Sequence, residues 1–327
     1  MPADKGPALD FRQSRTVKGH GLSLPERLRA ARGVPQAIVK VASYAQGRSE
    51  ALGQINYISR KGKLELETES GQRVTGKQEQ QALVRQWARD FGRRKNSRDT
   101  VHLVFSMPHD SDPEALRNSV RKVLQREFPG HEAVFAIHED TKYPHAHVVM
   151  KMQDRKKEKK LRLRKEDLHH LRETYAEAAR EEGVELAVSP RAARGVGRKG
   201  MKQAPYHLRQ RKMVPKAEKE TAQETVFELQ KGRVEEKPWE KAMQKRNQAE
   251  RKAYQAEAAR LRQAAARQSQ RDQAMLLQAA ADLERFSKDM PEPKTLRQTI
   301  LEFLNVPAPS KSQEPKPPAK GGNGIER

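Results

Sequence analysis

Residues 133–151 read Ala-Val-Phe-Ala-Ile-His-Glu-Asp-Thr-Lys-Tyr-Pro-His-Ala-His-Val-Val-Met-Lys, and the rest of the chain is organised around them. The alternation at its start predicts a strand that ends at His138. Residues 139–144 are polar and end in proline, which indicates a turn. A second strand follows, and its period of two places His145 and His147 on one face.

If these two strands pair as a hairpin, the imidazoles of His138, His145 and His147 meet at one end of a sheet. Three neutral imidazoles leave a divalent metal with open positions for water or substrate. Asp140 is placed to orient one ring through its second nitrogen. The alternative is a polar turn with unrelated histidines, but the chain has only ten histidines, and three of them fall in this one hairpin. The stretch therefore predicts a metal site.

The composition favours a partner with many negative charges. The chain has 327 residues, with 66 Lys and Arg against 43 Asp and Glu, and a formal charge of +23. Such an excess is typical of proteins that bind nucleic acid, although a basic chain can also be merely soluble or ribosome-like. The absence of cysteine excludes disulfides and thiolate zinc sites and fits a reducing cytosol.

Neither a membrane span nor a signal peptide is expected. No stretch reaches the length of a membrane-spanning helix, and the N-terminus lacks an apolar core. The sequence therefore predicts a soluble protein with no membrane insertion.

Periodicity predicts the elements around the hairpin. Strands are expected at 37–42, 101–106 and 184–186, and helices from Ser49 to Gly62, over 78–91, from Pro113 to Phe128 and over 167–182. Ser111 and Asp112 precede Pro113 as a helix-start signal. The order of these elements predicts an α+β fold in which helices pack on an antiparallel sheet.

The chain divides by composition into four regions. Residues 1–33 are predicted to be a basic flexible arm, with a short helix over 24–31. The folded domain is predicted to span 34–212, and a charged helical region follows at 213–305. Residues 306–327, rich in Pro, Lys, Gly and Ser, are predicted to be a disordered tail.

Four segments resemble motifs of one enzyme family. The histidine pattern of residues 138–147 looks like the three-histidine motif of plasmid relaxases, the HUH endonucleases that nick a transfer origin. Residues 56–66 resemble the tyrosine motif of T-DNA border-nicking relaxases and their MobA-type relatives. Residues 101–108 resemble the strand motif between the two, and residues 191–196 a basic segment downstream. The resemblance covers about residues 37–212.

The resemblance implies a metal-assisted transesterification. Tyr57 would attack one phosphodiester, leaving a free 3′-hydroxyl and a 5′-phosphotyrosine, with Mg²⁺ or Mn²⁺ as the metal. Asp140, or a histidine that it orients, would accept the phenolic proton. Tyr57 is favoured over Tyr44 and Tyr143 because it lies off the apolar face of its helix and is followed at once by basic residues.

The resemblance also implies partners and a location. Single-stranded DNA at a transfer origin with an inverted repeat would be the substrate, and accessory mobilisation proteins and a type IV secretion coupling protein would assist. The protein would act in the cytoplasm of a bacterial donor and be exported with the DNA. Candidate DNA contacts are Arg60, Lys61, Lys63, Ser106, Lys156, Lys157, Arg191 and Arg194, whereas His102 is expected to be packed in the sheet.

Two other readings stay open. A replication initiator or transposase of the HUH superfamily would share the motif. A non-enzymatic nucleic-acid binder could use the histidines for a structural metal, although structural sites usually close the shell with four protein ligands, often cysteines.

Overall fold

The computed structural model describes residues 22–304, apart from 93, 95, 155–159, 197–202 and 233. Most of the predicted N-terminal arm, the predicted tail from residue 306 and the basic pair Lys156 and Lys157 lie outside the described residues.

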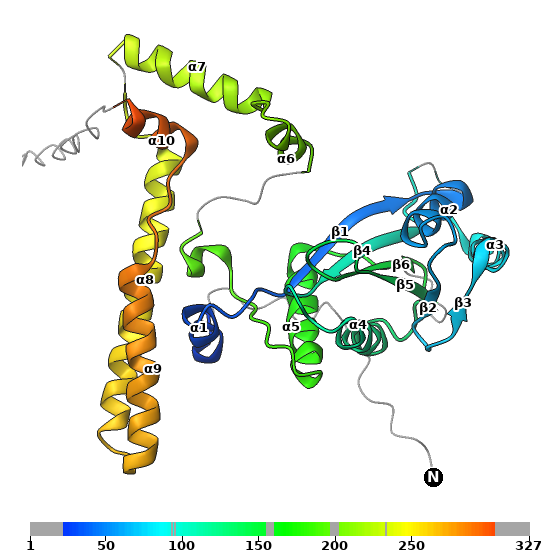
Figure 1. The fold of residues 1–327 in the computed structure, drawn as a ribbon, viewed down its shortest axis with the longest axis horizontal. Helices are drawn as coiled ribbons and strands as arrows, with labels where there is room; N and C mark the ends of the chain where they lie inside the picture. The colour runs from blue at the N-terminus through cyan, green and yellow to red at the C-terminus, as the bar shows by residue number, and fades with distance from the viewer. Residues whose placement is uncertain are drawn as a thin grey trace, which may run out of the picture. The chain divides into compact units, whose positions relative to one another are not determined.

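An antiparallel sheet organises the N-terminal half, which confirms the predicted α+β class (Figure 1). Its strands lie in the order β1-β4-β6-β5-β2-β3. Their bounds are Ile38–Ala45 for β1, Thr100–Ser106 for β4, His145–Lys151 for β6, Ala133–His138 for β5, Leu66–Thr68 for β2 and Arg73–Val74 for β3.

The helices of this half follow the apolar periodicity of the sequence. They are α1 (Leu24–Ala31), α2 (Gly47–Ile58), α3 (Gly76–Trp87, with a short 3₁₀ turn after it), α4 (Pro113–Glu127) and α5 (Lys165–Glu181). The predicted start of α4 is confirmed, because Pro113 occupies the first turn and the Asp112 side chain accepts from the backbone N–H of Glu114.

One hairpin of the fold was not predicted, and one predicted strand is absent. The β2–β3 hairpin was not predicted because its strands are short and charged; Glu67 of β2 is buried only because Arg117 and Arg121 of α4 pair with it, at 3.0 and 2.6 Å. The strand predicted at 184–186 does not form. Instead Ala187 makes a single bridge beside the start of β1.

The sheet has two different faces. One face carries Val101, Leu103, Phe105, Val148 and their neighbours in a buried core under α4 and α5. The other face is covered by α2 and α3, which lie on the opposite side of the sheet from α4 and α5 (Figure 1). That second core is smaller and takes only Val134, Ala136 and Val149 from the central strands. The remaining end of this face holds histidines.

The C-terminal region is helical, as predicted, but in separate segments. Its helices are α6 (Gln203–Gln210), α7 (Lys216–Gln230), α8 (Pro238–Ala265), α9 (Gln270–Asp289) and α10 (Leu296–Phe303). Residues Tyr254–Ser287 belong to the same compact unit as the sheet, and the described residues of Gly195–Ala253 and of 288–304 form a second unit. Within the first unit the buried Tyr254 donates to the carbonyl of Ala193 at 2.8 Å.

Among the described residues, no helix is both long and apolar enough to cross a membrane.

Candidate active site

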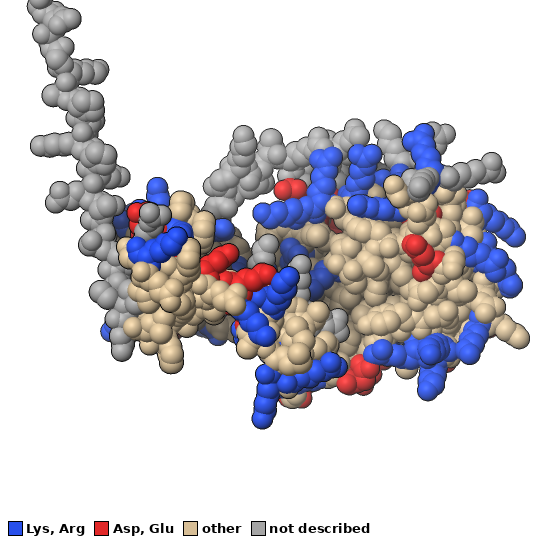
Figure 2. Space-filling model, turned by 90° about the horizontal axis from the view of Figure 1, so that it is seen from above, with Lys and Arg blue, Asp and Glu red and all other residues tan. Residues whose placement is uncertain are grey.

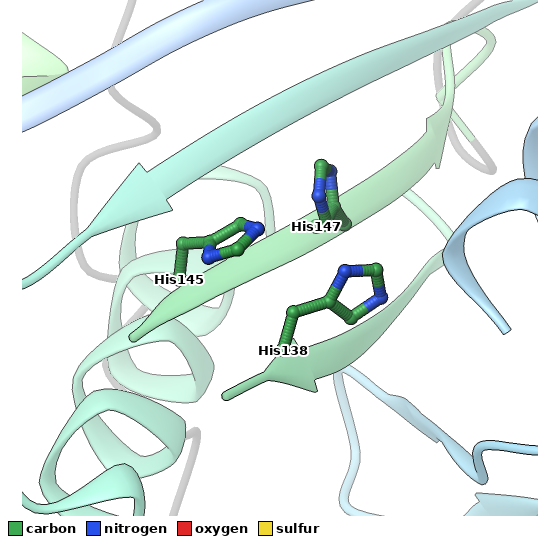
Figure 3. A group of neighbouring side chains, drawn as sticks. All are labelled: His138, His145 and His147. Atoms are coloured by element: carbon green, nitrogen blue, oxygen red, sulfur yellow. The ribbon is translucent and has the colours of Figure 1, made fainter. Parts of the chain in front are cut away.

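The β5–β6 hairpin brings the three predicted histidines together. His138 ends β5 opposite His145 at the start of β6, and His147 lies opposite Ala136. Because residues two apart share a face, the three rings stand on the same side of the two strands (Figure 3). One nitrogen from each ring lies within 4.8 Å of the others, so the group could hold a metal ion.

One nitrogen of each ring already contacts another group of the protein. His138 Nε2 lies 2.7 Å from the carbonyl of Ile58, His145 Nδ1 lies 3.1 Å from the carbonyl of Tyr143, and His147 Nδ1 lies 2.7 Å from His102 Nε2. His138 Nδ1 is buried and has no hydrogen-bond partner among the described residues. One lone pair on each ring is thus left for a metal, and the residues fit such an ion.

Burial lowers the pKa values of three rings at this site, those of His138, His147 and His102. Desolvation, with the neighbouring His138, lowers the pKa of His147 to about 3 and that of His102 to about 4. Desolvation also lowers the pKa of His138. Neutral imidazoles at pH 7 keep the lone pairs that metal binding needs.

Tyr57 lies directly beside this cluster. Ile55 and Ile58 anchor the last turn of α2 in the smaller core, and one residue along a helix turns the side chain by about 100°, so Tyr57 leaves that face. Its side chain is 54% exposed. Its ring centre lies 5.4 Å from that of His147, at right angles, and 5.8 Å from that of His102.

The competing tyrosines have other surroundings. Tyr44 is half-buried against the larger core, with the guanidinium of Arg98 lying 4.3 Å from its ring centre. Tyr143 is exposed in the turn, and its ring packs 6.2 Å from that of His109.

Asp140 has a different partner from the one predicted. Its carboxylate pairs with the guanidinium of Arg60 and not with an imidazole. The reason is that the second nitrogens of the three histidines already contact Ile58, Tyr143 and His102. The Arg60 guanidinium in turn lies 5.8 Å from the centre of the Tyr57 ring, so Arg60 lies beside both Asp140 and Tyr57.

Comparison with known families agrees with this geometry. The model of the MobA/VirD2-like relaxase nuclease domain matches residues 57–184. Residues 57–184 are a MobA/VirD2-like relaxase nuclease domain. No curated protein matches the chain.

The basic residues next to Tyr57 lie at the surface of the relaxase domain. Arg60 and Lys61 adopt positive φ angles of 52° and 60° in the loop after α2. Lys61 and Lys63 are exposed, and Arg60 is half-buried. Lysine and arginine side chains outnumber acidic ones on the face drawn in Figure 2. Ser106, at the end of β4, lies opposite His145 in the register.

The downstream basic segment is partly used inside the fold. Arg191 and Arg194 lie in a 3₁₀ turn, Arg191–Arg194. The Arg194 guanidinium donates to the Ser189 hydroxyl and, at 2.6 Å, to the carbonyl of Val34. Arg191 is exposed, whereas Arg194 holds two chain segments together.

The contacts of His102 were not predicted from the sequence. It is buried, as predicted, but it also contacts both His147 and Tyr57. The sequence held an indication of this. His102 and Ser106 are four residues apart in β4 and so share one face of the sheet, and Ser106 lies opposite His145 of the metal site.

Proposed function

We propose that this chain is a site- and strand-specific relaxase that nicks a plasmid transfer origin through attack of Tyr57 on a phosphodiester. The observation that carries the proposal is the position of Tyr57, exposed and in ring contact with one histidine of a cluster suited to a metal. A tyrosine that only packed α2 against the sheet would be expected on the face of Ile55 and Ile58 instead.

In the proposed reaction the Tyr57 oxygen bonds to phosphorus and the bond from phosphorus to the 3′-oxygen breaks. The 3′-oxygen takes up a proton, and the 5′-phosphate stays on Tyr57. Because one phosphoester replaces another, the reverse reaction can rejoin the strand. A phenol with a reference pKa near 10 is a weak nucleophile and needs a base. We assign that role to Asp140, which Arg60 holds near Tyr57.

His138, His145 and His147 would hold the metal, with Mg²⁺ or Mn²⁺ as the candidates. A bound divalent ion would polarise the scissile phosphate and offset the charge of the transition state. The chain's own contribution is orientation, since each ring is fixed by a neighbour at its other nitrogen.

The substrate is proposed to be single-stranded DNA beside an inverted repeat at the origin. Arg60, Lys61, Lys63, Ser106 and Arg191 are the proposed DNA contacts among the described residues. The charges of the lysines and arginines would neutralise backbone phosphates, and the Ser106 hydroxyl could donate to one, so affinity should fall steeply with salt.

Transfer of the nicked strand would need further proteins. We propose accessory mobilisation proteins at the origin and a type IV secretion coupling protein, with the relaxase made in the donor cytoplasm and exported with its DNA. The charged helices after residue 212 are the proposed region for these contacts.

The test uses labelled single strands tiled across the plasmid's own transfer region, with Mn²⁺ or with a chelator. We expect one strand to be cut at one site, with a covalent protein–DNA product that forms only with metal. Absence of the product on every strand would favour a non-enzymatic binder. Cleavage only at a replication origin or transposon end would instead favour another HUH enzyme.

A further inference from the structure

His102 connects the two parts of the candidate site. Its Nε2 lies 2.7 Å from His147 Nδ1, and its ring centre lies 5.8 Å from that of Tyr57. The side chain is 5% exposed and sits in the middle of β4, between two paired strands. A ring buried between paired strands has little freedom to move, so it can fix the positions of the His147 and Tyr57 rings that it contacts.

The hydrogen bond fixes where the protons of both rings lie. If His147 is to bind a metal, it must do so through Nε2, because His102 already engages Nδ1. A neutral ring that ligates through Nε2 carries its proton on Nδ1. His147 Nδ1–H then donates to His102 Nε2, and the proton of His102 lies on its Nδ1.

The partner of His147 differs in kind from those of the other two histidines. His138 contacts the backbone carbonyl of Ile58, and His145 contacts that of Tyr143. His145 Nδ1 also has the Thr141 hydroxyl at 3.4 Å, but its backbone partner would remain if Thr141 were changed. Among the described contacts, that of His147 depends on a side chain alone, so a single substitution can remove it. Without an acceptor, a buried Nδ1–H would be left unpaired, which folded proteins rarely tolerate.

We propose that His102 is a positioning residue of the nicking reaction: it accepts the Nδ1 proton of His147, and its ring supports Tyr57. This rests on the proposed function. Through the first contact His102 sets which nitrogen of His147 faces the metal, and through the second it limits the directions open to the Tyr57 ring.

The two contacts can be separated by substitution. His102→Phe keeps a ring against Tyr57 and removes the acceptor. His102→Gln places an amide oxygen near the former Nε2 and restores the acceptor. His102→Ala removes both contacts. His109→Phe, a change at an exposed histidine in the loop after β4, is the matched control.

The first measurement is the Mn²⁺ dissociation constant of each DNA-free protein by electron paramagnetic resonance, with circular dichroism to check folding. We expect His102→Phe to weaken Mn²⁺ binding by about 10- to 100-fold, a size typical of lost outer-shell partners. His102→Gln should stay within a few-fold of wild type, and His109→Phe should match it. Unchanged binding by a folded His102→Phe protein would overturn the proposal.

If His102→Phe does not fold, the comparison of His102→Gln with His102→Asn tests the proposal instead. Gln reaches the Nε2 position and Asn does not, so His102→Gln should bind Mn²⁺ at least about 10-fold more tightly than His102→Asn. Equal binding would contradict the role of the acceptor.

The second measurement is the nicking rate at saturating Mn²⁺. His102→Phe should recover most of the wild-type rate, whereas His102→Ala should stay slow, since only alanine removes the support of Tyr57. Full recovery by alanine would overturn that half of the proposal. If the wild-type protein binds Mn²⁺ but nicks no DNA, the proposed function fails, and the Mn²⁺ comparison still tests His102.

Discussion

Alternate residues of the same strands have opposite surroundings on the two faces of the sheet. On β4, Leu103 and Phe105 are buried in the larger core under α4 and α5. Their neighbours His102 and Ser106 lie on the other face, which carries the smaller core at one end and the histidine cluster at the other. One face therefore supplies the packing that keeps the strands rigid, and the other face uses that rigidity to hold polar groups close together.

The largest expected effect is at the face of the sheet that carries the histidine cluster. Tyr57→Phe removes only the hydroxyl of an exposed side chain, so folding and DNA binding should be kept. Nicking should fall by roughly 10⁴-fold or more, because the attacking atom is gone. Single-turnover assays on origin DNA measure this, and Tyr143→Phe serves as the matched control. Residual nicking within about 10-fold of wild type would show that another group attacks.

Substitutions on the face buried under α4 and α5 should change the stability of the protein. Phe105 is fully buried beside Tyr175, at 5.1 Å between ring centres, so Phe105→Ala should lower the free energy of unfolding by about 3–5 kcal/mol. Val104, its half-buried neighbour on the other face, should cost about 1 kcal/mol when changed to alanine. Urea denaturation compares the two. Equal losses would mean that the faces do not differ as described.

Removing one metal-site histidine should separate cutting from binding. His147→Ala should lower the nicking rate by roughly 10²- to 10³-fold, and a chelator should do the same to the wild type. DNA affinity should change little, because phosphate contacts supply most of it. Parallel nicking and filter-binding assays test this. Nicking that survives both treatments would rule out the proposed metal site.

Acid should weaken the metal-free protein through the same face. His147 and His102 have pKa values lowered to about 3 and about 4, whereas unfolded histidines titrate near 6.5. Below pH 6.5 both histidines take up protons in the unfolded chain but stay neutral in the folded chain, so the free energy of unfolding should fall by roughly 2 kcal/mol per pH unit between pH 6 and pH 4. Urea titrations at several pH values measure the slope, which His102→Phe should reduce.

The smallest effect concerns the exposed lysines after α2. Lys61→Gln with Lys63→Gln should reduce the slope of log DNA affinity against log salt concentration by about 1.4, since each lost phosphate contact removes about 0.7. Arg194→Gln is the control, because its guanidinium is held by Ser189 and Val34 and its loss should affect stability instead. An unchanged slope in the double lysine variant would place the DNA elsewhere.

The histidine hairpin could be predicted from sequence because strand alternation is strict and short in range. His138, His145 and His147 meet as their spacing indicated, and Tyr57 leaves the buried face of α2 as its helix periodicity indicated. These are local properties of one hairpin and one helix.

The remaining features depend on partners that are distant in the sequence. Glu67 enters a strand only because two arginines of α4 neutralise it. Asp140 pairs with Arg60, eighty residues away, because the histidines already have partners at their second nitrogens. His102 meets His147 through the β4–β6 register, which no local pattern specifies. Such contacts require the tertiary fold.

The central claim is that Tyr57 is the nucleophile beside a three-histidine metal site. The most direct test traps the wild-type protein on an origin strand, digests the adduct and maps the nucleotide by mass spectrometry. We predict that the nucleotide is found on the peptide containing Tyr57, attached through a 5′-phosphate. An adduct on Tyr44, Tyr143 or any other residue would contradict the assignment.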